Sequence, residues 1–128
     1  MQAHELLDNT RALLPGILES AQEIEDSQTI PADLLKALSD AGLFSVAVPK
    51  ELGGPELDPL VVFDALEMIA TADASTAWVI LIISANPLLF GNSLQMPVWQ
   101  AMYGEDVNAR TAGTLMPGAH YLALIDER

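Results

Sequence analysis

The sequence predicts an all-α fold of five to six helices built around a buried central helix. Three observations lead to this prediction. Apolar residues recur at the helical period of about 3.6 residues through most of the chain. Proline, glycine or aspartate stands at nearly every boundary between these segments, as is typical of helix ends. A long apolar run from Ala77 to Phe90 can be shielded from water only inside a domain.

Composition sets the size of the domain and excludes several classes of function. The 128 residues are 51% apolar, enough for one domain with a buried core. The formal net charge of -13 argues against binding to nucleic acid or to anionic membrane surfaces, because both need clustered Lys and Arg. The absence of cysteine excludes disulfides, thiolate nucleophiles and the usual zinc sites.

The N-terminal residues do not resemble a targeting segment. The opening stretch MQAHELLDNTRALLPG lacks the basic and apolar regions of a signal peptide. Its acidic residues Glu5 and Asp8 are also unlike a transit peptide. A cytoplasmic location is therefore expected.

Two helices are expected in the first 26 residues, over 3–14 and 15–26. Pro15 is predicted to end the first helix or to open the second, because proline lacks a backbone donor. The acidic residues between Glu19 and Asp26 lie on one side of the second segment and indicate a solvated face.

The next helix opens at Pro31 and ends at Gly42, where a left-handed C-terminal cap is expected. The apolar run 43–48 is predicted as a brief extended segment or as buried coil. PKELGGPELDP then gives the strongest turn signal in the chain. Asp58 is a good N-cap and Pro59 suits the first helical position, so a further helix, mostly buried, is predicted from residue 59.

Asp73 or Ser75 is expected to cap the apolar helix that follows. The run 77–90 is too short for a membrane span, which needs roughly 20 residues. Its flanks also carry no positive charge, so we expect a helix buried on all sides. Pro87 should kink or end it. Pro97 then opens a last short helix that Gly104 closes.

The order of these signals resembles a known family. The resemblance depends on three segments: IPADLLKALSDAGLFSVAVPKELGGPELDP, LVVFDALEMIATADASTAWV and VWQAMYGED. Together they resemble the N-terminal helical domain of the acyl-CoA dehydrogenase superfamily. The resemblance implies that residues 1–104 form this domain. It also implies that residues 105–128 are the start of a missing middle β-domain, with an atypical tail.

Within the superfamily the chain is more similar to the flavin-dependent monooxygenases. STAW at residues 75–78 resembles the Ser-Thr-Gly-Trp of that branch, and AGTLMPG at residues 112–118 resembles the start of its middle domain. The resemblance implies FAD or FMN as cofactor, an aromatic or heteroaromatic substrate and a separate flavin reductase. It also implies the tetrameric assembly common in the family.

The resemblance implies four site residues. Trp78 and Asn86 would face the substrate, and Thr114 and Met116 would lie near the flavin. The alternatives are that Trp78 is a core residue and that Asn86 satisfies a carbonyl freed by Pro87 or caps a neighbouring helix. The branch often has a histidine where this chain has Asn86, so no acid–base role follows.

No catalytic or metal-binding residue is expected. His4 and His120 are far apart in the sequence and have no companion ligands at a recognisable spacing. The catalytic residues of the family lie in a C-terminal helical bundle, beyond the point where the likeness stops near Gly118.

The resemblance therefore implies the N-terminal part of a flavin-dependent monooxygenase. Two alternatives stay open: an acyl-CoA dehydrogenase acting on an acyl thioester, and a non-catalytic helical module or gene fragment. A glutamate base in the C-terminal bundle would favour the dehydrogenase, and the ending YLALIDER favours a fragment. This chain alone is expected to be inactive and not to retain flavin.

Overall fold

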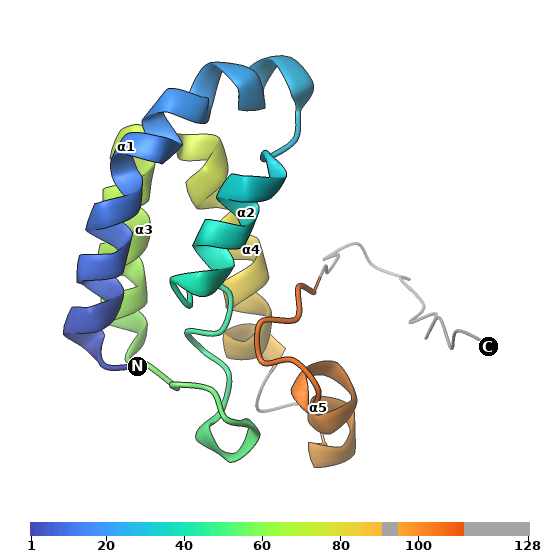
Figure 1. The fold of residues 1–128 in the computed structure, drawn as a ribbon. Helices are drawn as coiled ribbons and strands as arrows, with labels where there is room; N and C mark the ends of the chain where they lie inside the picture. Colours follow the sequence, from blue (N-terminus) through green and yellow to red (C-terminus); the bar gives the residue numbers. More distant parts are fainter. Residues whose placement is uncertain (91–94, 112–128) are drawn as a thin grey trace.

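A computed structural model of the chain describes residues 1–90 and 95–111 (Figure 1). No strand occurs in these two ranges, so the predicted all-α class is confirmed. The elements, in chain order, are α1 (Ala3–Ser27), α2 (Ala32–Asp40), the 3-10 helix η1 (Lys50–Leu52), α3 (Pro59–Ala72), α4 (Ala74–Phe90) and α5 (Met96–Tyr103).

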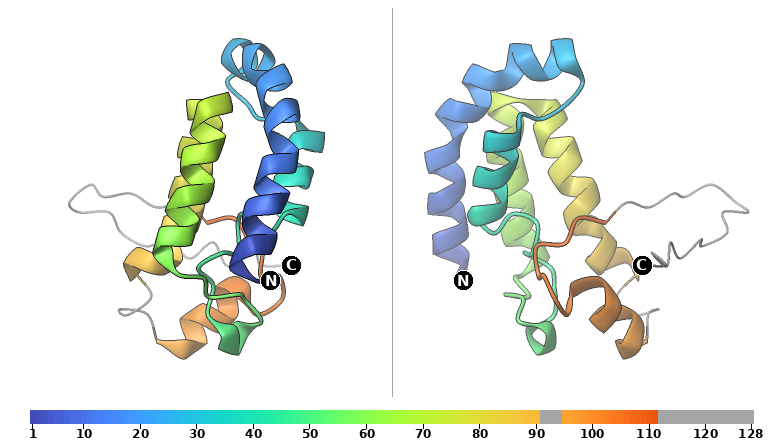
Figure 2. Two further views of the ribbon diagram at one scale, coloured as in Figure 1. Left: turned by 90° about the vertical axis from the view of Figure 1, so that its left-hand side faces the viewer. Right: turned by 45° about the vertical axis from the view of Figure 1, so that its right-hand side comes forward.

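Helices α1, α3 and α4 form the body of the molecule. α1 lies beside α3, and α4 turns back after α3 and packs against it (Figures 1 and 2). α2 packs on α1, while η1 and α5 pack together at the end of the bundle that holds the N-terminus.

α1 is one helix where two were expected. It continues through Pro15 to Ser27, and it bends so that its second part crosses the top of the bundle (Figure 1). A proline inside a helix removes one hydrogen bond and favours such a bend. Ile17 and Ile24 are buried beyond the proline, so core packing holds the second part in place despite the lost bond.

The end of α2 follows the predicted left-handed cap. Gly42 has a φ of 82°, and its N–H donates to Ser39 O at 2.9 Å. The N–H of Leu43 donates to Leu38 O at 3.2 Å, and both of these leucines are buried. This pair of bonds is a Schellman motif, which satisfies the last carbonyls of the helix.

The apolar run 43–48 forms buried turns, which agrees with the coil alternative. Two backbone hydrogen bonds tie it to the segment before α3, from Leu57 N to Val46 O and from Glu56 N to Val48 O. A Cβ on Gly54 would lie 2.1 Å from Val48 O, so only glycine fits where the Gly54 backbone passes the end of the run 43–48.

The apolar helix α4 is central and buried on its inner face, but its outer face is open. Thr76, Ala77, Ile80, Ser84 and Pro87 are buried. Trp78 is 62% exposed, and the neighbouring Val79 and Ile82 are also exposed. The expectation of burial on all sides therefore needs correction, because the described helices cover only one side of α4.

Two hydrophobic clusters hold the described residues together. The larger joins α1, α2, α3, α4 and the segment 43–47. The smaller is formed by Val48, Trp99 and Tyr103, with Leu52, Met102 and Ala109 packed around it. Val48 thus links the bundle to the unit built on α5.

Candidate functional site

The outer face of α4 is the first part of the candidate site. This face is formed by Trp78 and by the residues one, four and eight positions after it, which are Val79, Ile82 and Asn86. The spacing places all four along one side of the helix. Eight residues of helix extend over about 12 Å. An exposed apolar stripe therefore leads from Trp78 to an amide at Asn86.

A carboxylate fixes the start of this helix. Asp73 lies between α3 and α4, and its Oδ2 accepts a hydrogen bond from Thr76 N at 2.6 Å. The Ser75 hydroxyl donates to both carboxylate oxygens at 2.9 Å. Partial burial acts to raise the pKa of Asp73, but the hydrogen bonds from Thr76 and Ser75 outweigh it and hold that pKa below its ordinary value of 3.8.

Asn86 joins α4 to the chain that follows α5. Its Nδ2 donates to Thr111 O at 3.1 Å and to Thr111 Oγ1 at 2.9 Å. The Tyr103 hydroxyl lies 3.3 Å from the same Thr111 Oγ1. Burial raises the pKa of Tyr103, although the hydrogen bond with Thr111 opposes this, so the phenol keeps its proton at neutral pH.

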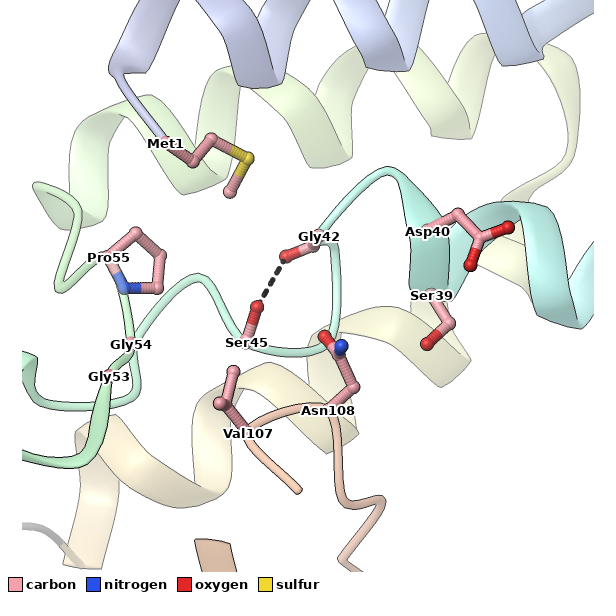
Figure 3. Close-up of a pocket in the computed structure, with 10 residues that line it drawn as sticks. All are labelled: Met1, Ser39, Asp40, Gly42, Ser45, Gly53, Gly54, Pro55, Val107 and Asn108. Atoms are coloured by element: carbon pink, nitrogen blue, oxygen red, sulfur yellow. Dashed lines mark hydrogen bonds between the residues drawn. The ribbon is translucent and has the colours of Figure 1, made fainter. Parts of the chain in front are cut away.

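Two shallow hollows are formed between α2 and the segment 106–110. The larger, of about 460 Å³, is bounded by the end of α2, the Gly53–Gly54 turn and the segment that contains Asn108 (Figure 3). Ser45 Oγ donates to Gly42 O at its floor, at 3.2 Å. Its lining residues include no Lys or Arg, so it does not suit a phosphate group.

The smaller hollow, of about 320 Å³, lies between α2 and residues 106–110. Lys36 and Arg110 line it, together with Asp106. Lys36 Nζ already pairs with Asp40 Oδ2 at 2.5 Å, so little net positive charge remains for an anionic ligand.

The structure places two of the four predicted site residues. Trp78 lies on the surface and not in the core of the described bundle. Asn86 is half-buried and is hydrogen-bonded to Thr111, a partner that the sequence did not suggest. Thr114 and Met116 lie outside the described residues. Ser84 Oγ donates back to Ile80 O at 2.8 Å, as expected of a serine inside a helix.

Sequence reasoning missed Thr111 and Tyr103. The one available signal was general: an amide in an apolar helix must find a partner. That partner is 25 residues further along the chain, so no local pattern could identify it.

The described part of the chain contains neither a cluster of metal ligands nor a helix suited to span a membrane. No group of three or more His, Asp or Glu residues is arranged there to hold a metal ion. None of the described helices combines the length and the apolarity needed to cross a membrane.

Residues 2–99 match the family described as "Acyl-CoA dehydrogenase, N-terminal domain". The chain belongs to this family. The predicted resemblance is confirmed, and the helical bundle is accordingly the N-terminal domain of the acyl-CoA dehydrogenase family.

Within the acyl-CoA dehydrogenase family, the chain is similar to flavin-dependent monooxygenases. The oxygenase subunit HsaA of Rhodococcus jostii (strain RHA1) is 38% identical over 109 residues, which are 83% of this chain and 28% of that protein. HsaA of Mycobacterium tuberculosis (strain ATCC 25618 / H37Rv) is 35% identical over 108 residues, 82% of this chain and 26% of that protein.

Solved structures agree with these relatives. The crystal structure of the HsaA monooxygenase from M. tuberculosis has a TM-score of 0.80 at 31% identity, and the match covers 86% of this chain and 30% of that one. The chain thus spans less than a third of the length of the relatives it matches.

Proposed function

We propose that the chain is the N-terminal helical part of the oxygenase component of a flavin-dependent monooxygenase. The proposed reaction is hydroxylation of an aromatic or heteroaromatic substrate with reduced flavin from a separate reductase. The proposed setting is a tetrameric oxygenase in the cytoplasm. The observation that carries the proposal is the 38% identity to an oxygenase subunit over 83% of the chain.

The outer face of α4 supports a role as one wall of the substrate pocket. A planar aromatic substrate packs well against an indole ring and aliphatic side chains. Trp78 and Ile82 offer such a surface, and it is open among the described residues. Trp78 is therefore assigned to substrate binding in this proposal.

Asn86 is assigned to the polar end of the same wall. Its Nδ2 already donates to Thr111, so its carbonyl oxygen, Oδ1, is the atom that would contact the substrate. This oxygen would accept a hydrogen bond from a substrate hydroxyl group. A phenolic hydroxyl is a suitable donor for that oxygen. This geometry supports orientation of the substrate, and it gives Asn86 no part in proton transfer.

The described residues fit the flavin only in part. Flavin supplies the oxidising chemistry when bound, and the apolar face of α4 can border a flat ring system. The larger hollow is lined by no Lys or Arg, and in the smaller one Lys36 is paired with Asp40 and Asp106 shares the lining with Arg110, so neither offers the cluster of positive charge that suits a phosphate. We assign Thr114 and Met116 to the flavin ring on the strength of the family resemblance, and the phosphates to parts of the oxygenase beyond this chain.

This division of the site predicts weak flavin binding by the 128-residue chain. One wall cannot offset the loss of translational and rotational freedom, which costs several kcal/mol at least. The purified chain should be colourless, with a Kd for FAD or FMN on the order of millimolar or weaker. Absorbance after gel filtration and a fluorescence titration measure this. A yellow chain with stoichiometric flavin would contradict it.

A chimera tests the proposal itself. Residues 1–111 of this chain would replace the matching part of the R. jostii HsaA oxygenase subunit, and reduced flavin would be supplied chemically. We expect flavin binding and hydroxylation of a phenol. Trp78→Ala should raise the KM for the phenol about tenfold, the effect of losing one aromatic contact, and leave flavin affinity within about twofold.

Phe63→Ala is the matched control, since Phe63 is also a large exposed aromatic residue but lies on α3. It should change the KM by less than about twofold. Equal effects of the two substitutions would remove Trp78 from the pocket. Turnover of an acyl thioester, with none of phenols, would reject the monooxygenase proposal in favour of a dehydrogenase.

A further inference from the structure

The side chain of Asn86 can present two opposite kinds of hydrogen-bonding group. Its amide has an NH2 group that donates and a carbonyl oxygen that accepts, and the two groups are of nearly the same size. Rotation of the amide by half a turn exchanges them. An asparagine that rotates therefore offers a ligand either group, whereas an asparagine held in one orientation offers only one of them.

The backbone carbonyl of Thr111 holds the Asn86 amide in one orientation. Nδ2 donates to Thr111 O at 3.1 Å. A carbonyl oxygen can only accept a hydrogen bond. In the rotated amide, Oδ1 would take the place of Nδ2, and two acceptors would face each other with no hydrogen between them. The NH2 group must therefore face Thr111.

The Thr111 hydroxyl adds a second contact and is itself held by Tyr103. Oγ1 accepts from the same Nδ2 at 2.9 Å and lies 3.3 Å from the Tyr103 hydroxyl. Tyr103 is only 1% exposed, and its ring centroid lies 5.5 Å from that of Trp99. Because the Tyr103 ring is fixed by this packing, its hydroxyl restricts the rotation of the Thr111 side chain.

The carbonyl oxygen of Asn86 is the group that remains for a ligand. The hydrogen bonds among the described residues include none to Oδ1. Asn86 lies on the same side of α4 as the exposed Trp78 and Ile82. The sequence 74–104 contains no Asp, Glu, Lys, Arg or His, so α4 itself offers a ligand hydrogen bonds but no ion pair.

We propose that Thr111 and Tyr103 are positioning residues that turn the Asn86 carbonyl oxygen towards the substrate, so that this end of the α4 face selects ligands that donate a hydrogen bond. The ligand class is a neutral aromatic molecule with a hydroxyl group. An ether of the same shape can only accept, and it would place its oxygen against Oδ1. The inference rests on the proposed function, because it concerns the substrate of that same site.

The orientation of Asn86 is testable in the 128-residue chain by nuclear magnetic resonance. Its Nδ2 protons should show nuclear Overhauser effects to Thr111. They should exchange with water at least about tenfold more slowly than those of Asn9, an exposed asparagine on α1. Thr111→Val removes Oγ1 and should accelerate this exchange about threefold or more, whereas Thr111→Ser should not. Exchange as fast as that of Asn9 would overturn the proposal.

Ligand selectivity in the chimera tests the consequence. Phenol donates through its hydroxyl, whereas anisole, its methyl ether, can only accept. With oxidised flavin and no turnover, titration calorimetry should give a Kd about tenfold lower for phenol than for anisole, the discrimination that one hydrogen bond provides. Thr111→Val and Tyr103→Phe should each lower this ratio about threefold or more, and Thr111→Ser should retain it.

The ratio of the two Kd values separates positioning from a general structural effect. A loosened fold would weaken both ligands alike, but a rotating amide weakens the preference for phenol. Thr10→Val is the matched control, because Thr10 is a fully buried threonine whose Oγ1 donates to Leu6 O at 2.7 Å inside α1. It should leave the ratio unchanged. An unchanged ratio in Thr111→Val would overturn the positioning role.

The two proposals fail in different ways. A chimera that binds neither flavin nor phenol would reject the proposed function, and the selectivity with it. A chimera that hydroxylates phenol but binds anisole equally well would reject the selectivity and leave the proposed function intact.

Discussion

At the residue scale, two aspartates determine where the central helices start. Asp58 Oδ1 accepts from Leu60 N at 2.8 Å at the start of α3, and Asp73 does the same for Thr76 N at the start of α4. Each carboxylate replaces a hydrogen bond that the first turn of a helix lacks, and its charge favours the positive end of the helix.

The first prediction concerns the cap of α3. Asp58→Ala should lower the free energy of unfolding by about 1 kcal/mol, the usual loss for a capping residue. Urea denaturation followed by circular dichroism measures this. Asp64→Ala is the control, since Asp64 is exposed in the interior of α3, and it should cost less than about half as much. Equal losses would refute the capping role.

The second prediction concerns pH. The pKa of Asp73 is lowered in the folded chain, so its contribution to stability is complete above the unfolded pKa. That contribution is lost as pH falls through the folded pKa. The stability difference between the parent chain and Asp73→Asn should therefore be largest near neutral pH and shrink below about pH 4.

Urea denaturation of both proteins at pH 7 and at pH 3 measures this difference. Asp64→Asn serves as the control, because Asp64 is an exposed carboxylate in the interior of α3, away from either helix end. A difference between the parent chain and Asp73→Asn that stays constant over this pH range would contradict the assignment.

At the scale of elements, α4 has one buried face and one exposed face, although both are apolar in sequence. The helix is apolar nearly all round, so composition gives no direction to its packing. Packing on α3 buries one face and leaves Trp78, Val79 and Ile82 exposed. An exposed apolar stripe on a helix is a contact surface for another molecule or another part of the same protein.

The third prediction follows from this stripe. The 128-residue chain should bind a dye that reports apolar surface and should self-associate as its concentration rises. The double substitution Trp78→Gln with Ile82→Gln should reduce both effects, measured by dye fluorescence and sedimentation. Leu18→Gln is the control, because Leu18 is 62% exposed on α1 and stands apart from the stripe. A clean monomer without a dye signal would contradict the prediction.

At the scale of the whole molecule, the described residues form a bundle and a smaller attached unit. The bundle has a core that joins four helices, whereas the unit on α5 has a small one. Fewer buried apolar contacts mean a lower free energy of local opening. The unit should therefore open before the bundle unfolds.

The fourth prediction uses Trp99 as the reporter. In a Trp78→Phe variant, Trp99 is the only tryptophan left of the two in the chain. Its fluorescence should change at a urea midpoint lower by about 0.5 M than the loss of helical circular dichroism. Coincident transitions would mean that bundle and unit unfold together. Tyr103→Phe should increase the difference between the two urea midpoints, since it removes the hydrogen bond between the Tyr103 hydroxyl and Thr111.

The sequence by itself determined the fold class, the family and most helix ends. Proline at a first helical position, glycine after a last one and aspartate as a cap act within one or two turns of the chain, so a local pattern can show them. This is why Asp58, Gly42 and Gly104 were placed correctly.

Only the tertiary structure decided three other features. Pro15 stays inside one helix because core contacts beyond it outweigh a lost hydrogen bond. Among the described residues, the outer face of α4 is open because the neighbouring helices lie on one side of it. Asn86 finds its partner in Thr111. Each of these depends on residues distant in sequence, and their approach is set by packing of the whole chain and not by local preference.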